Sequence, residues 1–261
     1  MFDFHLHSSV SFDSTCDAQN IINAAKDAGL KEICFTDHYD FNDDPTKQHD
    51  FFTIEQYRSV YDNIDSNGIL VRKGVEFGLT HWNQKELEEL LSSYNFDFVI
   101  GSVHFAGGFD PYFKEFWTHN GIDEGFEKYL LQTLKCVKVQ NNFDVLGHIN
   151  YVCKSEHNPT KQPLRYNDYI DICDEIMKTL VENGKGMEIN TSGKDKVGEF
   201  LPSYDFVKRF KELGGEIVTV GSDSHDNARV GQYIPEALEI CKEVFGYVCT
   251  FENRKPIFNT L

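Results

Sequence analysis

The 261-residue sequence predicts an α/β fold, in which parallel strands close into a barrel within a single domain spanning residues 1–261. One observation is that seven short β-rich runs alternate with longer helical stretches, a pattern typical of right-handed βαβ units. A second is that each of the seven runs ends in a residue that can bind a metal ion. A closed barrel brings all its strand ends into one ring, whereas an open doubly wound sheet gathers functional residues at one switch point.

The elements follow from this alternation in chain order. The predicted strands cover residues 2–7, 32–36, 69–77, 96–104, 143–149, 186–191 and 216–222. The predicted helices cover residues 17–28, 53–66, 83–94, 123–140, 167–183, 203–213 and 235–245. Asp17 is placed to cap the first helix and Gly29 to end it. Residues 107–121 are expected to form an irregular aromatic loop, and a short tail is expected after the last helix.

Composition excludes several classes of protein. The formal net charge of −17 and the lack of a basic run argue against nucleic acid as a partner, because polyanions are held by clusters of Lys and Arg. No apolar run approaches the ~20 residues that cross a bilayer, and the N-terminus lacks a signal-peptide pattern. We therefore expect a soluble cytoplasmic protein that does not bind membranes. The seven cysteines form no CxxC pair and are expected to be reduced thiols. The oligomeric state stays open.

The polar residues at the predicted strand ends are the main functional signal. They are His5 and His7, Asp37 and His38, Glu76, His104, His148, Glu188 and Asn190, and Asp223 and His225. His5 and His7 are two residues apart, as are Asp223 and His225, so an extended chain would place each pair on one face. Imidazole suits zinc and iron, and carboxylate extends the range to manganese and magnesium. A lone histidine here would more simply be a hydrogen-bonded core residue, but six of the ten histidines share such positions. The other four, which are expected at the surface, are His49, His81, His119 and His157.

These residues stand in motifs that resemble the PHP (polymerase and histidinol phosphatase) phosphoesterases over essentially the whole chain. The motifs, in the order of that family, are His5-Leu6-His7 with Asp13, Thr36-Asp37-His38, Gly74-Val75-Glu76, Gly101-Ser102-Val103-His104, Gly147-His148, Glu188-Ile189-Asn190-Thr191-Ser192-Gly193 and Gly221-Ser222-Asp223-Ser224-His225. Within the superfamily the chain is most similar to the histidinol-phosphate phosphatases, through residues 35–41, 101–105 and 251–256.

The resemblance implies a distorted seven-stranded (β/α)7 TIM-like barrel that holds three divalent ions, namely zinc, manganese or iron. One ion would be held by His5, His7, Glu76 and Asp223, a second by Glu76, His104 and His148, and a third by Asp13, His38 and His225. Glu76, Asp223 and His225 are the implied catalytic residues. The implied reaction is attack of a metal-bridging hydroxide on a small phosphomonoester, foremost L-histidinol phosphate, which would place the protein in histidine biosynthesis. Some family members carry His in place of Asp13, and the carboxylate here is expected to make the third site more tolerant of manganese or iron.

Residues around the motifs are candidates for substrate contacts. The candidates for the phosphate are Lys154, Lys194, Arg165 and Arg229. Glu188 and Asn190 either touch the substrate or stabilise the rim of the barrel. Asp37 is expected to orient His38, the alternative being that it is merely a cap. The loop residues expected to favour a cationic organic group are Asp40, Asp43, Asp44, Asp195 and Asp226.

Three departures from the histidinol-phosphate phosphatases leave the substrate open. The chain has Asn150 and then Lys154-Ser155 where those enzymes have Asp and an Arg-Tyr pair, and Asp195 separates Lys194 from Lys196. Lysine cannot copy the planar, bidentate grip of arginine. The alternatives are a phosphotyrosine-protein phosphatase, a nuclease, or a non-catalytic metal-binding module. A complete ligand set that includes the bridging Glu76 argues against the module, because structural zinc sites are usually closed, four-coordinate and Cys-rich.

Overall fold

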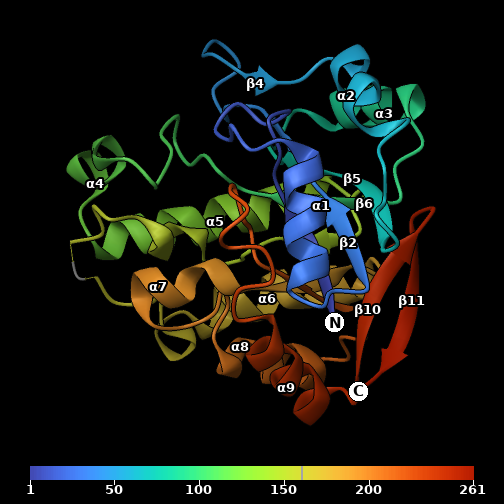
Figure 1. Cartoon of the computed structure of the whole chain (residues 1–261). Coiled ribbons are helices and arrows are strands. Elements are labelled where there is room, and N and C mark those ends of the chain that lie inside the picture. Colours follow the sequence, from blue (N-terminus) through green and yellow to red (C-terminus); the bar gives the residue numbers. More distant parts are fainter. Residues whose placement is uncertain (160) are drawn as a thin grey trace.

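A computed structural model describes residues 1–159 and 161–261, and it confirms the predicted α/β class. Parallel strands in the order β1-β2-β5-β6-β7-β8-β9 form a nearly closed barrel, with helices around it (Figure 1). The strands are β1 (Phe2–Leu6), β2 (Glu32–Phe35), β3 (His38–Asp40), β4 (Asp50–Phe51), β5 (Leu70–Gly78), β6 (Phe98–Ser102), β7 (Val145–Leu146), β8 (Gly186–Asn190), β9 (Val218–Gly221), β10 (Tyr247–Glu252) and β11 (Lys255–Thr260).

Helices lie within most of the predicted ranges, and the first two begin at side-chain caps that the sequence contains. Asp17 accepts a hydrogen bond from the Gln19 N–H at 2.9 Å, and Thr53 forms a capping box with Gln56. The α-helices are α1 (Ala18–Asp27), α2 (Ile54–Tyr61), α3 (Gln84–Ser93), α4 (Lys114–Asn120), α5 (Asp123–Val139), α6 (Ile170–Glu182), α7 (Lys194–Val197), α8 (Tyr204–Glu212) and α9 (Ile234–Val244); the 3₁₀ helices are η1 (Tyr151–Lys154), η2 (Tyr166–Asp168) and η3 (Thr191–Gly193). Among the described residues, no helix has the length and apolar character needed to span a bilayer.

The barrel closes between its first and last strands, next to the metal-ligand motifs. The Asp223 N–H donates to the His5 carbonyl at 2.8 Å, and the His7 N–H donates to the Ser224 carbonyl at 2.9 Å. Gly221 makes this approach possible, since a Cβ there would lie 2.3 Å from the Cβ of His5. Gly221 is therefore needed for closure of the barrel. Closure brings the first motif, which contains His5 and His7, next to the last, which contains Asp223 and His225.

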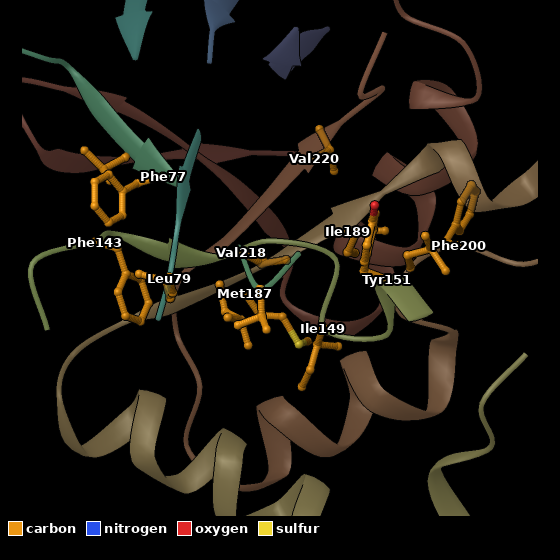
Figure 2. Packing of buried hydrophobic residues seen from close by; sticks show 14 of the residues in the cluster. Phe77, Leu79, Phe143, Ile149, Tyr151, Met187, Ile189, Phe200, Val218 and Val220 are labelled. Atoms are coloured by element: carbon orange, nitrogen blue, oxygen red, sulfur yellow. The ribbon is translucent and has the colours of Figure 1, made fainter. Parts of the chain in front are cut away.

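The main hydrophobic core joins the barrel to the helices around it. Figure 2 shows Met187 and Ile189 of β8 and Val218 of β9 packed in one cluster with Phe143 and Phe77. The buried helix faces contribute apolar residues to the same cluster, among them Ile21 and Ile22 of α1 and Phe206, Val207 and Phe210 of α8. The charged residues of these helices lie on their other faces, which is the amphipathic pattern expected of helices covering a barrel.

The expected short tail is instead a hairpin, formed by antiparallel pairing of β10 with β11 (Figure 1). Its turn residues Asn253 and Arg254 have φ of 49° and 64°, as a two-residue hairpin turn requires. Arg254 donates to Asp144, which lies just before β7, and its own N–H donates to the Asp97 carbonyl before β6. The hairpin therefore covers the N-terminal end of the barrel. Its Cys249 and Phe251 share a second apolar cluster with barrel residues Phe4, Cys34, Phe98, Ile100 and Val145.

Further differences lie where the chain leaves the strands. The predicted strand over residues 143–149 is reduced to β7, and the chain leaves the strand at Gly147, where a Cβ would lie 2.4 Å from the Ser102 Oγ. Residues 107–121, expected to be irregular, contain α4. The loop after β2 contains β3 and β4, which pair antiparallel. These elements are two to seven residues long, too short to give a periodic signal.

Candidate metal centre

Glu76, near the end of β5, lies at the centre of a cluster of histidines. Its side chain is fully buried. Oε1 lies 2.9 Å from the Nε2 of His148 and 3.3 Å from the Nε2 of His104. Oε2 faces three other rings, at 3.1 Å from His5 Nε2, 3.1 Å from His38 Nδ1 and 3.4 Å from His7 Nε2. The two carboxylate oxygens therefore face different histidines, which is the arrangement that a bridging ligand requires.

Asp223 reaches the same cluster from the turn after β9. Its Oδ1 lies 3.4 Å from His7 Nε2, 3.6 Å from His225 Nδ1 and 3.8 Å from His5 Nε2. β9 ends at Gly221, and Asp223 has φ of 53°, so the segment is not extended as the spacing suggested. Asp is among the residues that tolerate the left-handed region, where strained backbone often accompanies function. This turn, rather than strand alternation, brings both Asp223 and His225 to the site.

Asp13 joins the cluster from the loop after β1. Its Oδ2 lies 3.0 Å from His225 Nε2 and 3.6 Å from His38 Nε2. The His7 ring stacks against both of those histidines, with ring centroids 4.1 Å from His225 and 4.3 Å from His38. All nine residues predicted as ligands thus lie in one connected group, drawn from segments that span residues 5–225.

The donor atoms fit metal ions. His5 Nε2, His7 Nε2, His225 Nε2 and Glu76 Oε2 are buried, and although they lie close to one another, none makes a hydrogen bond of normal geometry with a described residue. A buried polar atom without a partner costs about 1–3 kcal/mol, which a bound cation would offset. The groups of three with ligand atoms within 4.8 Å of one another are His7-His38-His225, His5-Glu76-His148, His5-His7-Asp223 and His38-Asp40-His104. Imidazole nitrogens combined with carboxylate oxygens suit zinc, iron and manganese.

The charges within the cluster keep its carboxylates ionised. Burial by itself would raise the pKa of Glu76, but His5, His38 and His104 hold that pKa well below its usual range. Burial would likewise raise the pKa of Asp223, which Lys154 and His5 lower instead. Burial lowers the pKa of His7 well below its usual range, and the neighbouring His225 and His38 lower it further. A neutral His7 beside ionised carboxylates is the protonation state in which these groups bind a cation.

Buried carboxylates orient two of the histidines. Glu188 Oε1 lies 2.6 Å from His5 Nδ1, and Asp40 lies 3.0 Å from His104 Nδ1. Each contact leaves the Nε2 of its ring facing Glu76, as carboxylate–histidine pairs do at metal sites. Asp40 was expected at the rim as a charge for the substrate, and its part in orienting His104 was not predicted. Only the fold places it there, since the two residues are 64 positions apart.

Asn190 has the supporting one of its two expected roles, whereas Asp37 differs from its expected role. Asn190 is fully buried and its Nδ2 donates to Glu188 at 3.2 Å and to Asp223 at 3.3 Å, so it supports the cluster from behind and does not line the cavity. Glu188 is buried in the same way. Asp37, expected to orient His38, accepts instead from the Ser11 hydroxyl at 3.0 Å, and Ser11 Oγ lies 3.1 Å from His7 Nδ1. No sequence signal pointed to Ser11.

A cavity of about 420 Å³ opens onto the cluster. Two of the predicted phosphate contacts, Lys154 and Arg229, line it, and Lys154 Nζ lies 2.5 Å from Asp223 Oδ2. Lys196, which was not predicted, also lines it. Arg165 and Lys194 do not: both line a separate pocket, because Lys194 begins α7 with its Nζ over the Phe200 ring and Arg165 pairs with Glu199. The structure thus separates the four predicted cations into two groups.

Of the acidic residues expected at the rim, some line the cavity and others do not. Asp40 and Asp226 line the cavity, together with Asp110, which was not predicted. Asp43 instead accepts from the Gly107 and Gly108 N–H groups, at 2.7 and 2.6 Å. Neither Asp44 nor Asp195 lines the cavity, and Asp195 lies 3.4 Å from the guanidinium of Arg229. Aromatic side chains complete the wall, and they are Phe12, Phe105, Tyr112, Phe113 and Tyr151.

The histidines and cysteines that were not predicted as metal ligands take no part in this cluster. His119 and His157 are exposed and His49 and His81 are half-buried, and none belongs to a candidate metal group among the described residues. The seven cysteines are free thiols, and six of them are buried.

The barrel, with its histidine and carboxylate cluster at the C-terminal ends of the strands, defines a metal-dependent hydrolase of the PHP class. The PHP domain family matches residues 3–192, and the chain belongs to that family. A probable histidinol-phosphatase of Clostridium acetobutylicum is 33% identical over 99% of this chain and 96% of its own length. A histidinol-phosphatase of Lactococcus lactis subsp. lactis is 32% identical over 97% of this chain and 95% of its own.

A solved structure provides the spatial comparison. The histidinol phosphate phosphatase of Lactococcus lactis subsp. lactis, in complex with zinc, L-histidinol and phosphate, superposes with a TM-score of 0.83 at 30% identity. The match covers 98% of both chains.

Proposed function

We propose that this protein hydrolyses L-histidinol phosphate to L-histidinol and phosphate with the help of divalent metal ions. The observation that carries the proposal is the cluster around Glu76, whose nine ligand candidates resemble the set of a PHP phosphoesterase. Relatives named histidinol-phosphatase align over nearly the whole chain, which favours an enzyme over a metal-binding module. The segment after residue 192 supplies Asp223 and His225, which supports residues 1–261 acting as one domain.

The ligand atoms support three ion positions. His5, His7, Glu76 and Asp223 would hold one ion, Glu76, His104 and His148 a second, and Asp13, His38 and His225 a third. Divalent ions held in such sets, whether zinc, manganese or iron, activate water as a nucleophile and withdraw charge from phosphate oxygens. Glu76 is the proposed bridge between the first two positions, because its two oxygens face different rings.

The residues of the chain would bind and orient the ester. Lys154, Lys196 and Arg229 are the cations of the cavity, and they would contact phosphate oxygens. His225 borders the cavity beside Asp13 and would face the leaving oxygen. These basic residues follow β7, β8 and β9, whereas the aromatic residues Phe105, Tyr112 and Phe113 follow β6. The cavity can therefore hold the phosphate against one arc of the barrel and the organic group against another.

The carboxylates of the cavity support a cationic organic group. Asp110, close in sequence to the aromatic residues Tyr112 and Phe113, lines the cavity together with Asp226, and histidinol carries both an amine and an imidazole. The same carboxylates would repel an ester whose organic group is anionic. Their attraction for a cationic group should weaken as salt rises, because the Debye length is about 10 Å at 0.1 M.

Phosphate release from a panel of esters tests the proposal. We expect the highest kcat/KM for histidinol phosphate, with lower values for glycerol phosphate and phosphotyrosine. Chelator-treated protein serves as the control and should regain activity when zinc, manganese or iron is added. Equal turnover of the anionic esters would contradict the proposed substrate, and a chelated protein that remains fully active would contradict the metal requirement.

A further inference from the structure

A buried chain of hydrogen bonds runs from α2 to the metal-ligand candidate His7. Tyr61 OH donates to Asp37 Oδ2 at 2.5 Å, and Ser11 Oγ donates to Asp37 Oδ1 at 3.0 Å. Ser11 Oγ in turn lies 3.1 Å from His7 Nδ1. All four side chains are buried, with exposed fractions between 0% and 3%. The chain joins a helix, the loop after β2 and the loop after β1, so it exists only in the folded protein.

The direction of each hydrogen bond follows from the donors available. Asp37 is also contacted by the N–H of Ser8 at 2.7 Å, so every partner of its carboxylate is a donor. Ser11 has a single hydroxyl hydrogen, which Asp37 takes, and its oxygen already accepts from the His38 N–H at 3.0 Å. A hydroxyl has two acceptor lone pairs, and the second is left for His7 Nδ1. His7 must then carry its proton on Nδ1.

This choice of tautomer prepares the other ring nitrogen for a metal ion. With the proton on Nδ1, His7 Nε2 carries a lone pair, and it lies 3.4 Å from both Glu76 Oε2 and Asp223 Oδ1. It has no hydrogen-bond partner among the described residues. Partners that fix the ring and tautomer of a ligating histidine typically change metal affinity by about 10–100-fold.

We infer that Ser11, Asp37 and Tyr61 form a positioning relay that holds His7 in the Nδ1–H tautomer and so sets the affinity of the site for its metal ions. The relay rests on the proposed function, in which His7 is a ligand, and assigns these residues a part in that site. Ser11 is the central member, because it contacts both His7 and the backbone of His38.

The test is zinc affinity, measured with the full-length protein by competition against a chromogenic chelator, without substrate. Ser11→Ala should weaken zinc binding by about 10–100-fold, and Ser11→Thr, which keeps the hydroxyl, should restore most of it. Tyr61→Phe should weaken it less, because Asp37 keeps its contacts with Ser8 and Ser11. If Ser11→Ala fails to fold, Tyr61→Phe alone tests the relay.

Tyr57→Phe is the matched control for Tyr61→Phe. Tyr57 lies on the same helix, is equally buried, and donates to the Gly74 carbonyl at 2.8 Å rather than to Asp37. It should leave zinc affinity unchanged although it also removes a buried hydrogen bond. Equal losses in the two tyrosine variants would show a general structural effect and overturn the relay.

A spectroscopic readout separates positioning from packing. The ¹⁵N shifts of His7 should report the Nδ1–H tautomer in the wild type and a mixture in Ser11→Ala. If the wild type binds zinc and Ser11→Ala binds it with equal affinity, the relay is overturned and the proposed metal centre is not. Wild-type protein that binds no zinc would instead overturn the proposed metal centre, and the relay with it.

Discussion

The ammonium of Lys154 lies 2.5 Å from Oδ2 of Asp223, whose other oxygen faces His7 at 3.4 Å. A cation thus directly contacts a ligand candidate at the floor of the cavity. Burial alone would lower the pKa of Lys154, but Asp223 raises it, so the side chain remains charged. In this position it can neutralise Asp223 and still direct N–H groups toward a phosphate.

We expect Lys154→Met to lower kcat/KM for histidinol phosphate by roughly 10–100-fold, since a hydrogen bond to a charged group contributes about 1.5–3 kcal/mol. Lys154→Arg should retain part of the activity, because the charge remains. Steady-state kinetics and zinc content of each variant are the measurements, with exposed Lys208→Met on α8 as the control. An unchanged kcat/KM in Lys154→Met would refute a contact with the substrate.

Glu76 should be the least replaceable ligand. Glu76→Gln keeps the shape of the side chain and removes the charge from both oxygens at once, whereas His225→Ala removes one ring next to Asp13. We expect Glu76→Gln to lose more bound metal and more kcat than His225→Ala. Elemental analysis together with kcat decides this, and circular dichroism checks that both variants fold. Equal and mild losses would argue against the bridging role.

Asp110 should make substrate preference depend on pH. Burial raises the pKa of its carboxyl to about 6, although the Tyr112 N–H and the Tyr151 hydroxyl donate to it. The group is therefore neutral below that pH and negative above it, so its attraction for a cationic ester appears as pH rises through about 6.

The ratio of kcat/KM between wild type and Asp110→Asn isolates this effect from the titration of the substrate. The ratio should be near one at about pH 5 and should increase a few-fold by about pH 7.5, because a partly exposed ion pair contributes up to about 1 kcal/mol. With glycerol phosphate the same ratio should not increase. A flat ratio with histidinol phosphate would exclude Asp110 from substrate recognition.

Arg254 should stabilise the fold from the end of the barrel opposite the metal centre. Its Nε donates to Asp144 Oδ2 at 2.5 Å, and its Nη2 donates to the Asn142 carbonyl. Arg254→Met leaves the buried Asp144 carboxylate without its cation, which should cost about 1.5–3 kcal/mol of unfolding free energy. Urea unfolding measures this, and the exposed Lys255→Ala on the same hairpin is the control. A variant as stable as wild type would mean that the Arg254 side chain contributes nothing to the stability of the fold.

The sequence predicted the barrel and eight of the nine ligand candidates because both depend on local patterns, whereas Asp13 was implied by the family resemblance. Alternation of strands and helices sets the class of fold, and the C-terminal ends of parallel strands necessarily meet. His104 and His148 could therefore be assigned to one ring from their positions after β-rich runs. The hairpin of β10 and β11 escaped prediction because its turn, Asn253-Arg254, lacks the glycine that usually marks such a turn.

What the sequence determined by itself is the identity of the side chains that could meet: histidines and carboxylates at the ends of strands. What only the tertiary structure decided is how they meet. Glu188 contacts His5 across 183 positions of sequence, and Asp223 turns into the site through a left-handed backbone. The same folding directs Lys154 into the cavity and Lys194 away from it. Such contacts depend on barrel closure and loop geometry, and no local pattern encodes a distance between residues that are far apart in the chain.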